Sequence, residues 1–345
     1  MRVRRLLIPL LATVALGAGC GQWRDEDAAR VDGATVTMAE LRDEVDVLVE
    51  HPTWPPAFQV DVSAGAQASE QSATLVAWLN RRITDLAIDE ELVRRDIVLD
   101  DDARARAEGE LRFQLELYGE QASQSGQPAA PLDQFDQLPA GLRTALVERE
   151  AAREALASSV ATDGAEPLPA TAEEWFEANE GNYERYCVSI IVSADEASSN
   201  GLLARLEAGE DFAAVASTES LDSATAAQGG AADCAMASQL TPELAGDLAA
   251  AEVNDVVGPL QLANGWFLIK LTGIEPPSFQ AAEGVVRVDR LNARQIALND
   301  WLSQASPSVT VAPRLGTWDA EMFQVAANTG PLPANQPANP AGGQS

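Results

Sequence analysis

Side chains able to do acid-base, nucleophilic or metal chemistry are few in this chain. His51 is the only histidine among 345 residues, and it lies in the stretch HPTWPP, where a solvated loop residue is the simplest interpretation. A single histidine leaves little room for a catalytic triad or a histidine-containing metal cluster, and no Cys-x-x-Cys spacing exists. Neither is there a phosphate-binding loop motif. We therefore expect no metal and no cofactor, and most enzyme classes are disfavoured.

The first cysteine belongs to an export signal. The chain begins MRVRRLLIPLLATVALGAGC, where arginines precede an apolar run from Leu6 to Ala18. This run is too short to span a bilayer comfortably, since a spanning helix needs ~20 apolar residues. Gly19 and Cys20 then complete the pattern of a lipoprotein signal peptide, residues 1–20, in which the cysteine is acylated. Gly17 stands where such signals usually have leucine, so an ordinary secretory signal with a stray cysteine is the alternative.

The two other cysteines, Cys187 and Cys234, form an even pair once Cys20 is assigned to the lipid. An exported protein folds in an oxidising compartment, where disulfides persist. We favour a structural disulfide between these two cysteines.

The net charge of the chain disfavours two classes of binding partner. The 23 basic and 53 acidic side chains give a net charge of -30. Such a field repels the phosphates of nucleic acids and the headgroups of anionic lipids, so neither is expected as a direct partner. Solubility is the simplest explanation of the acidity. The length suits about two domains.

The amino-terminal half is predicted to be mostly helical. A brief strand with an Asp-Gly turn at 31–37 leads into a helix at 38–50, where apolar residues recur at helical spacing. An amphipathic helix or pair of helices follows at 74–98. Asp100 to Asp102 then suit the start of another helix, because carboxylates there meet unpaired amides. The stretches 52–72 and 122–137 have the composition of loops, and a last helix precedes a linker at 163–169.

The carboxy-terminal half mixes strands and helices. The residues 187–192 are apolar and β-branched, as in a strand. Helical segments and a Gly229-Gly230 break follow. Two further strands, 256–262 and 266–271, are joined by an Asn264-Gly265 turn, which is a strong hairpin signal. These elements predict a compact α+β unit, whereas the Ala-, Asn-, Pro- and Gly-rich residues 326–345 predict a disordered tail.

Six phrases in this half occur in the order and spacing of a known family. They are SIIV from Ser189, GEDFAAVA from Gly209, SLD from Ser220, GG at Gly229, GP at Gly258 and GWFLIK from Gly265. Residues 170–276 thus resemble the parvulin domain of peptidyl-prolyl cis-trans isomerases. The resemblance implies a four-stranded antiparallel sheet with flanking helices.

The flanking segments resemble a narrower group within that family. VDGATVTMAEL, LVAWLNRRITDLAIDEELVRRD and VTVAPRLGTWD look like the chaperone portion of SurA-type and PrsA-type extracytoplasmic foldases. The resemblance implies a helical, chaperone-like domain at 24–165. It also implies that a helix and strand at 277–322 return to that domain.

The resemblance also implies where the active site lies, and this chain lacks the family's catalytic histidines there. The family has two histidines facing each other across the pocket floor, and their positions here hold Ser189 and Phe267. Asp222 takes the position of a Cys or Asp beside the prolyl bond, although a cap of a helix or turn explains it equally well. Apolar proline-pocket positions map to Leu240, Leu244 and Phe267, and Phe267 also fits a simple core position. The family topology brings Cys187 and Cys234 close together, on the first and second strands of the sheet.

Two functions follow from this resemblance. The first is a membrane-anchored, extracytoplasmic prolyl isomerase that assists unfolded, proline-containing exported proteins. The second is a holdase chaperone that binds such clients through an inactive parvulin domain. The loss of both histidines predicts weak isomerase activity or none.

Overall fold

The computed structural model describes residues 27–60, 62, 68–126, 130–160, 167–262 and 265–326. Cys20 with the signal segment, Asn264 and the tail beyond 326 lie outside the described residues. The chain divides into two compact units, Met1–Ala152 with Ser303–Ser345, and Arg153–Leu302. The domain boundaries inferred from the sequence remain predictions. No helix in the described part of the chain is long and apolar enough to cross a membrane.

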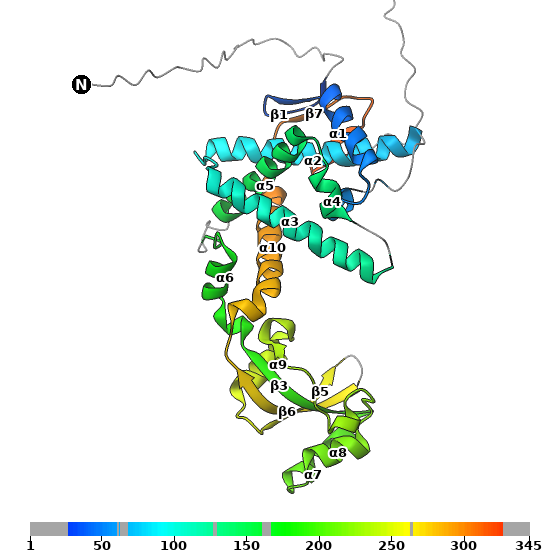
Figure 1. The fold of residues 1–345 in the computed structure, drawn as a ribbon, viewed down its shortest axis with the longest axis vertical. Helices are drawn as coiled ribbons and strands as arrows, with labels where there is room; N and C mark the ends of the chain where they lie inside the picture. Colours follow the sequence, from blue (N-terminus) through cyan, green and yellow to red (C-terminus); the bar gives the residue numbers. More distant parts are fainter. Residues whose placement is uncertain are drawn as a thin grey trace, which may run out of the picture. The chain divides into compact units, whose positions relative to one another are not determined.

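The first unit contains a small sheet built from both ends of the chain (Figure 1). The strands β1 (Asp27–Val31) and β2 (Ala34–Thr37) form a hairpin rather than one strand, because Asp32 and Gly33 both take positive φ at the turn. The strand β7 (Val309–Val311) pairs antiparallel with β1. A second hairpin, β8 (Thr317–Asp319) and β9 (Gln324–Ala326), follows it.

Five α-helices begin in the described part of the first unit. They are α1 (Met38–Glu50), α2 (Ala68–Arg94), α3 (Asp101–Gln124), α4 (Pro131–Asp136) and α5 (Ala140–Val160). Asp100 caps α3, accepting a hydrogen bond from the Ala103 amide at 2.7 Å, as its carboxylate predicted. His51 begins the loop after α1, as predicted, but it is half-buried, with Nδ1 3.1 Å from the Val47 carbonyl oxygen.

The two stretches predicted as loops are partly helical. A 3₁₀ turn, Pro55–Phe58, and the start of α2 fall in the first, while the end of α3 and all of α4 fall in the second. Tertiary packing explains the difference. The ring of Phe135 in α4 is fully buried and packs edge-on against Trp54, with ring centroids 6.4 Å apart. Short-range composition carries no sign of that contact.

The second unit holds a four-stranded antiparallel sheet in the order β4-β3-β6-β5. Its strands are β3 (Arg185–Ser193), β4 (Ala235–Met236), β5 (Val256–Leu262) and β6 (Gly265–Glu275). Its helices are α6 (Ala172–Ala178), α7 (Glu196–Glu207), α8 (Phe212–Glu219), α9 (Pro242–Ala250) and α10 (Phe279–Gln304), with 3₁₀ turns at Glu180–Tyr183, Ala226–Gln228 and Ala237–Gln239. The predicted α+β fold with a four-stranded antiparallel sheet is confirmed.

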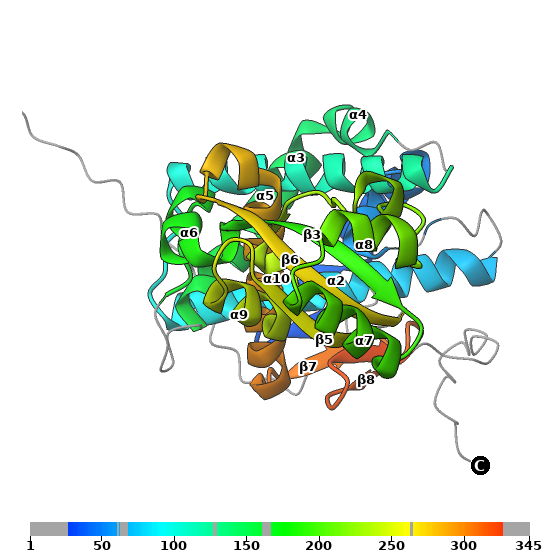
Figure 2. The ribbon, with the colours of Figure 1, turned by 90° about the horizontal axis from the view of Figure 1, so that it is seen from below.

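Helices cover both faces of this sheet (Figure 1 and Figure 2). Ile191 and Leu268 of the two central strands pack against α7 and α8 on one face. Tyr186, Ile269 and Leu271 of the same strands pack against α9 on the other face. Neighbouring side chains of a strand point to opposite faces, so the sequence alternation divides β3 and β6 cleanly between the two cores.

Candidate functional site

The face of the sheet beneath α9 carries an apolar surface that is only partly covered. Four residues, Tyr186, Leu248, Ile269 and Leu271, form its buried base. Around them lie half-buried apolar side chains from three strands, α9 and its leading turn: Val188, Ile190, Ala237, Leu240, Leu244, Ala251, Val257, Leu260 and Phe267. Half-buried apolar side chains at a common surface offer a place for an apolar ligand to displace water. We take this surface, which we call the α9 face, as the candidate site.

The three predicted pocket residues come together on the α9 face. Leu240 precedes α9, Leu244 lies in its first turn, and Phe267 projects from β6 opposite Val192 of β3 and Leu260 of β5. All three pack against the same buried base. The α9 helix holds Leu244 in place, because Thr241 caps it and Pro242 occupies its first position.

Ser189 is not brought together with Phe267. The register pairs Ser189 with Lys270, while Phe267 pairs with Val192. Opposite residues of an antiparallel pair share a face, and an odd number of residues separates the two pairs along the strands. Ser189 therefore lies on the α7 and α8 face, away from Phe267. The two positions therefore do not face each other.

Asp222 shapes a turn at the edge of the α9 face. Its carboxylate accepts hydrogen bonds from the Thr225 hydroxyl at 2.5 Å and the Ala224 amide at 3.2 Å. The Thr225 hydrogen bond, followed by the Ala224 amide, lowers the pKa of Asp222. The Leu221 amide just before it donates to the carbonyl of Val192 at 2.8 Å, so this turn is tied to the residue opposite Phe267. The structure shows the capping role, and a pocket role stays a prediction.

The Gly229-Gly230 sequence is required sterically at its second position. Gly230 takes φ +83°, and its carbonyl accepts a hydrogen bond from the Ile190 amide at 2.7 Å. A Cβ on Gly230 would collide with the Ile190 carbonyl oxygen. The backbone thus lies directly against β3, which only glycine permits at this position.

Cys187 and Cys234 are joined by a disulfide. It links β3 to the segment entering β4, across 47 residues of sequence. Glu275 lies beside it, bound to Arg185 at 2.6 Å. These two sulfurs and the Glu275 carboxylate are close enough to hold a metal, but disulfide sulfurs are not the thiolates that bind zinc. We therefore assign no metal site here.

Sequence reasoning missed the base of the α9 face. Tyr186 is buried there, and its hydroxyl donates to Glu184 at 2.8 Å. Burial, then the Glu184 hydrogen bond, raises the pKa of Tyr186 to about 12. Alternation along β3 places Tyr186, Val188 and Ile190 on one face, and this pattern was the available signal.

Comparison with known proteins agrees with this geometry. The PPIC-type PPIASE domain matches residues 167–285, which include every strand of the four-stranded sheet. The chain carries a parvulin domain. The predicted resemblance to SurA- and PrsA-type proteins with a parvulin domain is confirmed by the relatives that follow.

Three curated relatives are similar over part of their length. A parvulin-like PPIase of Rickettsia bellii is 30% identical over 137 residues, which cover 38% of this chain and 48% of the relative. The foldase protein PrsA of Caldanaerobacter subterraneus is 26% identical, covering 36% of this chain and 40% of the relative. The chaperone SurA of Alkalilimnicola ehrlichii is 38% identical over 71 residues, covering 21% and 16%. The matches thus span less than half the length of these relatives.

Proposed function

We propose that this protein is an extracytoplasmic folding factor whose parvulin domain binds unfolded, proline-containing segments on the α9 face. The observation that carries the proposal is the gathering of Leu240, Leu244 and Phe267 over one buried apolar base. Binding is favourable when a proline ring or a neighbouring apolar side chain of the client covers these half-buried apolar side chains, because apolar surface is removed from water. The parvulin domain and the foldase and chaperone relatives support the same class of client.

The chemistry that this site supports is binding rather than proton transfer. Prolyl isomerisation breaks no covalent bond, and its barrier of ~18–20 kcal/mol is rotational. An apolar surface lowers such a barrier by desolvating the imide and holding it twisted. Phe267 has no hydrogen-bonding group, and Ser189 lies on the other face of the sheet. Weak isomerisation or a holdase role without isomerisation follows from this arrangement.

A protease-coupled assay on a prolyl peptide separates these two roles. The chain from residue 21 onward is compared with Leu244→Asp, which places a charge on the α9 face, and with Glu207→Gln as an exposed control on α7. A rate above background that Leu244→Asp removes establishes the isomerase. Peptide binding without any rate, also lost in Leu244→Asp, establishes the holdase. Absence of peptide binding by the unmodified chain refutes both.

We also propose that Cys20 anchors the protein to the outer face of a membrane. The arginine-rich start, the apolar run and Ala18-Gly19-Cys20 support a processed lipoprotein signal. One acyl chain binds reversibly, so stable anchoring needs more than one. Metabolic labelling with a fatty acid tests this proposal. Label that persists in Cys20→Ala would refute it.

A further inference from the structure

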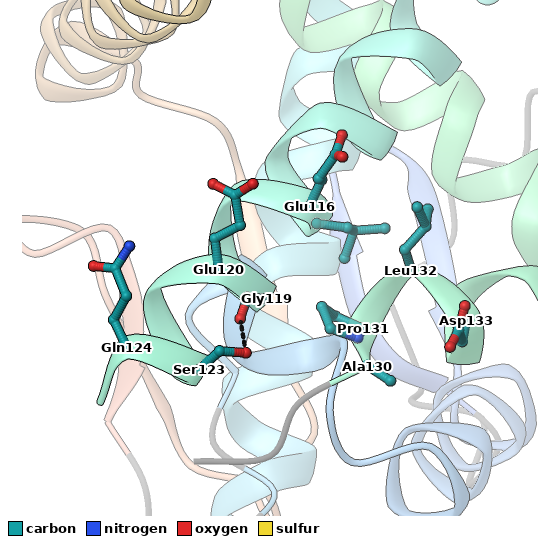
Figure 3. A pocket seen from close by; sticks show the side chains of 10 residues that line it. Glu116, Gly119, Glu120, Ser123, Gln124, Ala130, Pro131, Leu132 and Asp133 are labelled. Atoms are coloured by element: carbon teal, nitrogen blue, oxygen red, sulfur yellow. Dashed lines mark hydrogen bonds between the residues drawn. The ribbon is translucent and has the colours of Figure 1, made fainter. Parts of the chain in front are cut away.

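A groove opens between the carboxy-terminal turns of α3 and the start of α4, far in sequence from the parvulin domain. It is a wide, open groove of about 710 Å³ and lies entirely within the first unit. Figure 3 shows side chains of α3 on one wall, including Glu116, Glu120 and Ser123, and Ala130 to Asp133 on the other wall. None of the predicted site residues lines it.

The groove combines an apolar floor with an acidic rim. The half-buried Leu132 and the exposed Ala130 supply apolar contact, whereas Leu115 in the lining is fully buried. The carboxylates of Glu116, Glu120 and Asp133 are exposed, and no basic residue lines the groove. Within the described part of the chain, none of these three carboxylates makes a hydrogen bond or ion pair.

In contrast, neighbouring carboxylates on the same two helices form ion pairs with an arginine. Arg112 pairs with Glu108 at 3.1 Å and with Asp136 at 2.8 Å. Asp136 ends α4, one turn after Asp133, and its partner Arg112 does not line the groove. The negative charge of the groove is therefore local and uncompensated. The net charge of -30 strengthens attraction for cations approaching it.

A metal ion does not explain this arrangement. Among the residues that the structure describes, only Cys187, Cys234 and Glu275 bring three potential ligand atoms within 4.8 Å of one another. The three groove carboxylates are thus too widely spread for one ion. Three carboxylates spread along an apolar floor can instead each meet a separate positive charge of one bound polypeptide.

We propose that this groove binds polypeptide segments in which lysine or arginine alternates with apolar side chains. The apolar side chains cover Leu132 and Ala130, while the cations meet Glu116, Glu120 and Asp133. The site is separate from the α9 face and requires neither a proline nor isomerisation.

The test measures the affinity of the chain from residue 21 onward for a short labelled peptide rich in lysine and leucine, at low salt. A matched peptide has glutamate in place of each lysine. We expect only the cationic peptide to bind, with an affinity that falls as salt is raised. The triple variant Glu116→Gln, Glu120→Gln, Asp133→Asn should bind it roughly tenfold less tightly, because each exposed charge contact is modest.

A second triple variant controls for total charge. Asp43→Asn, Asp102→Asn and Glu321→Gln remove three exposed charges of the same unit outside the groove, and we expect less than a twofold effect. Leu132→Ser tests the apolar contribution and should also weaken binding. Circular dichroism checks that each variant is folded.

Several results would overturn the proposal. Equal losses in the two triple variants would mean that only the general field attracts the peptide. Equal binding of the glutamate peptide, or no binding of the cationic peptide, would refute the groove as its site. Displacement of the peptide by calcium at constant ionic strength would indicate a metal site instead. If Leu244→Asp abolished binding of the cationic peptide and the groove variants did not, the peptide would be assigned to the α9 face.

Discussion

Ser189 and Phe267 lie on opposite faces of the parvulin sheet, because Ser189 is paired with Lys270 and Phe267 with Val192. The two positions that carry histidines in the resembling family are therefore not neighbours here. Neither side chain can therefore contact the other directly.

Histidines introduced at positions 189 and 267 should not interact with each other. In Ser189→His with Phe267→His, we expect the two imidazoles to titrate independently in NMR, since the sheet lies between them. In Val192→His with Phe267→His, directly opposite side chains about 5 Å apart should show coupled titration. His51 supplies an internal reference signal. Coupling between the imidazoles at 189 and 267 would contradict the register.

Truncation on the α9 face should weaken peptide binding. Phe267→Ala and Leu244→Ala each remove apolar contact worth about 1 to 2 kcal/mol, or roughly fivefold to thirtyfold in affinity. Isothermal titration with a proline-containing apolar peptide measures the effect. Leu203→Ala, a half-buried residue on the α7 face, is the matched control. A loss in the control equal to that in Phe267→Ala would argue against the α9 face.

The disulfide should stabilise the second unit considerably. Closing 47 residues is worth about 4 kcal/mol in the loop-entropy model. We expect urea unfolding of Cys187→Ser with Cys234→Ser to show a loss of this order. Thiol titration of the denatured, unreduced chain from residue 21 should find neither cysteine free. Two reactive thiols would refute the bridge.

Arg290 and Glu154 form a buried ion pair that joins α10 to α5 within the second unit. Arg290 also donates to the carbonyls of Pro169 at 3.1 Å and Ala170 at 2.7 Å. Arg290→Met should lower the free energy of unfolding by about 3 to 5 kcal/mol, because Glu154 keeps a buried, unpaired charge. Adding Glu154→Leu should recover part of this loss. Denaturant unfolding tests both, and a double variant less stable than Arg290→Met would contradict this explanation.

Stability should fall at alkaline pH through Tyr186. Its pKa is raised to about 12 by burial, whereas an unfolded tyrosine titrates near ~10. The stabilisation is fully present below pH ~10 and is lost as pH rises toward 12, because the unfolded chain releases its proton first. Between pH ~9 and ~11, the unmodified chain should lose about 1 kcal/mol more than Tyr186→Phe in urea unfolding. Identical losses would show that the hydroxyl titrates normally.

Part of the second unit was predictable from sequence. Strand alternation predicted β3, β5 and β6, because neighbouring side chains of a strand point to opposite faces. The four-stranded sheet and the pocket positions Leu240, Leu244 and Phe267 came from the resemblance carried by the six motifs, and the structure has that sheet and places those three residues in one cluster. The start of α3 at Asp100 was predictable as well.

Other features depend on contacts between distant residues. The register that separates Ser189 from Phe267 joins strands some 80 residues apart, and a slip of one residue would move every side chain of a strand to the opposite face. Helix α4 forms where composition predicted a loop, because Phe135 is buried against Trp54. By itself, the sequence determined the resemblance to parvulin domains and the positions of the strands and of the apolar side chains along them. Only the tertiary structure decided which of them share a face, because strand pairing and side-chain burial are set by the whole fold.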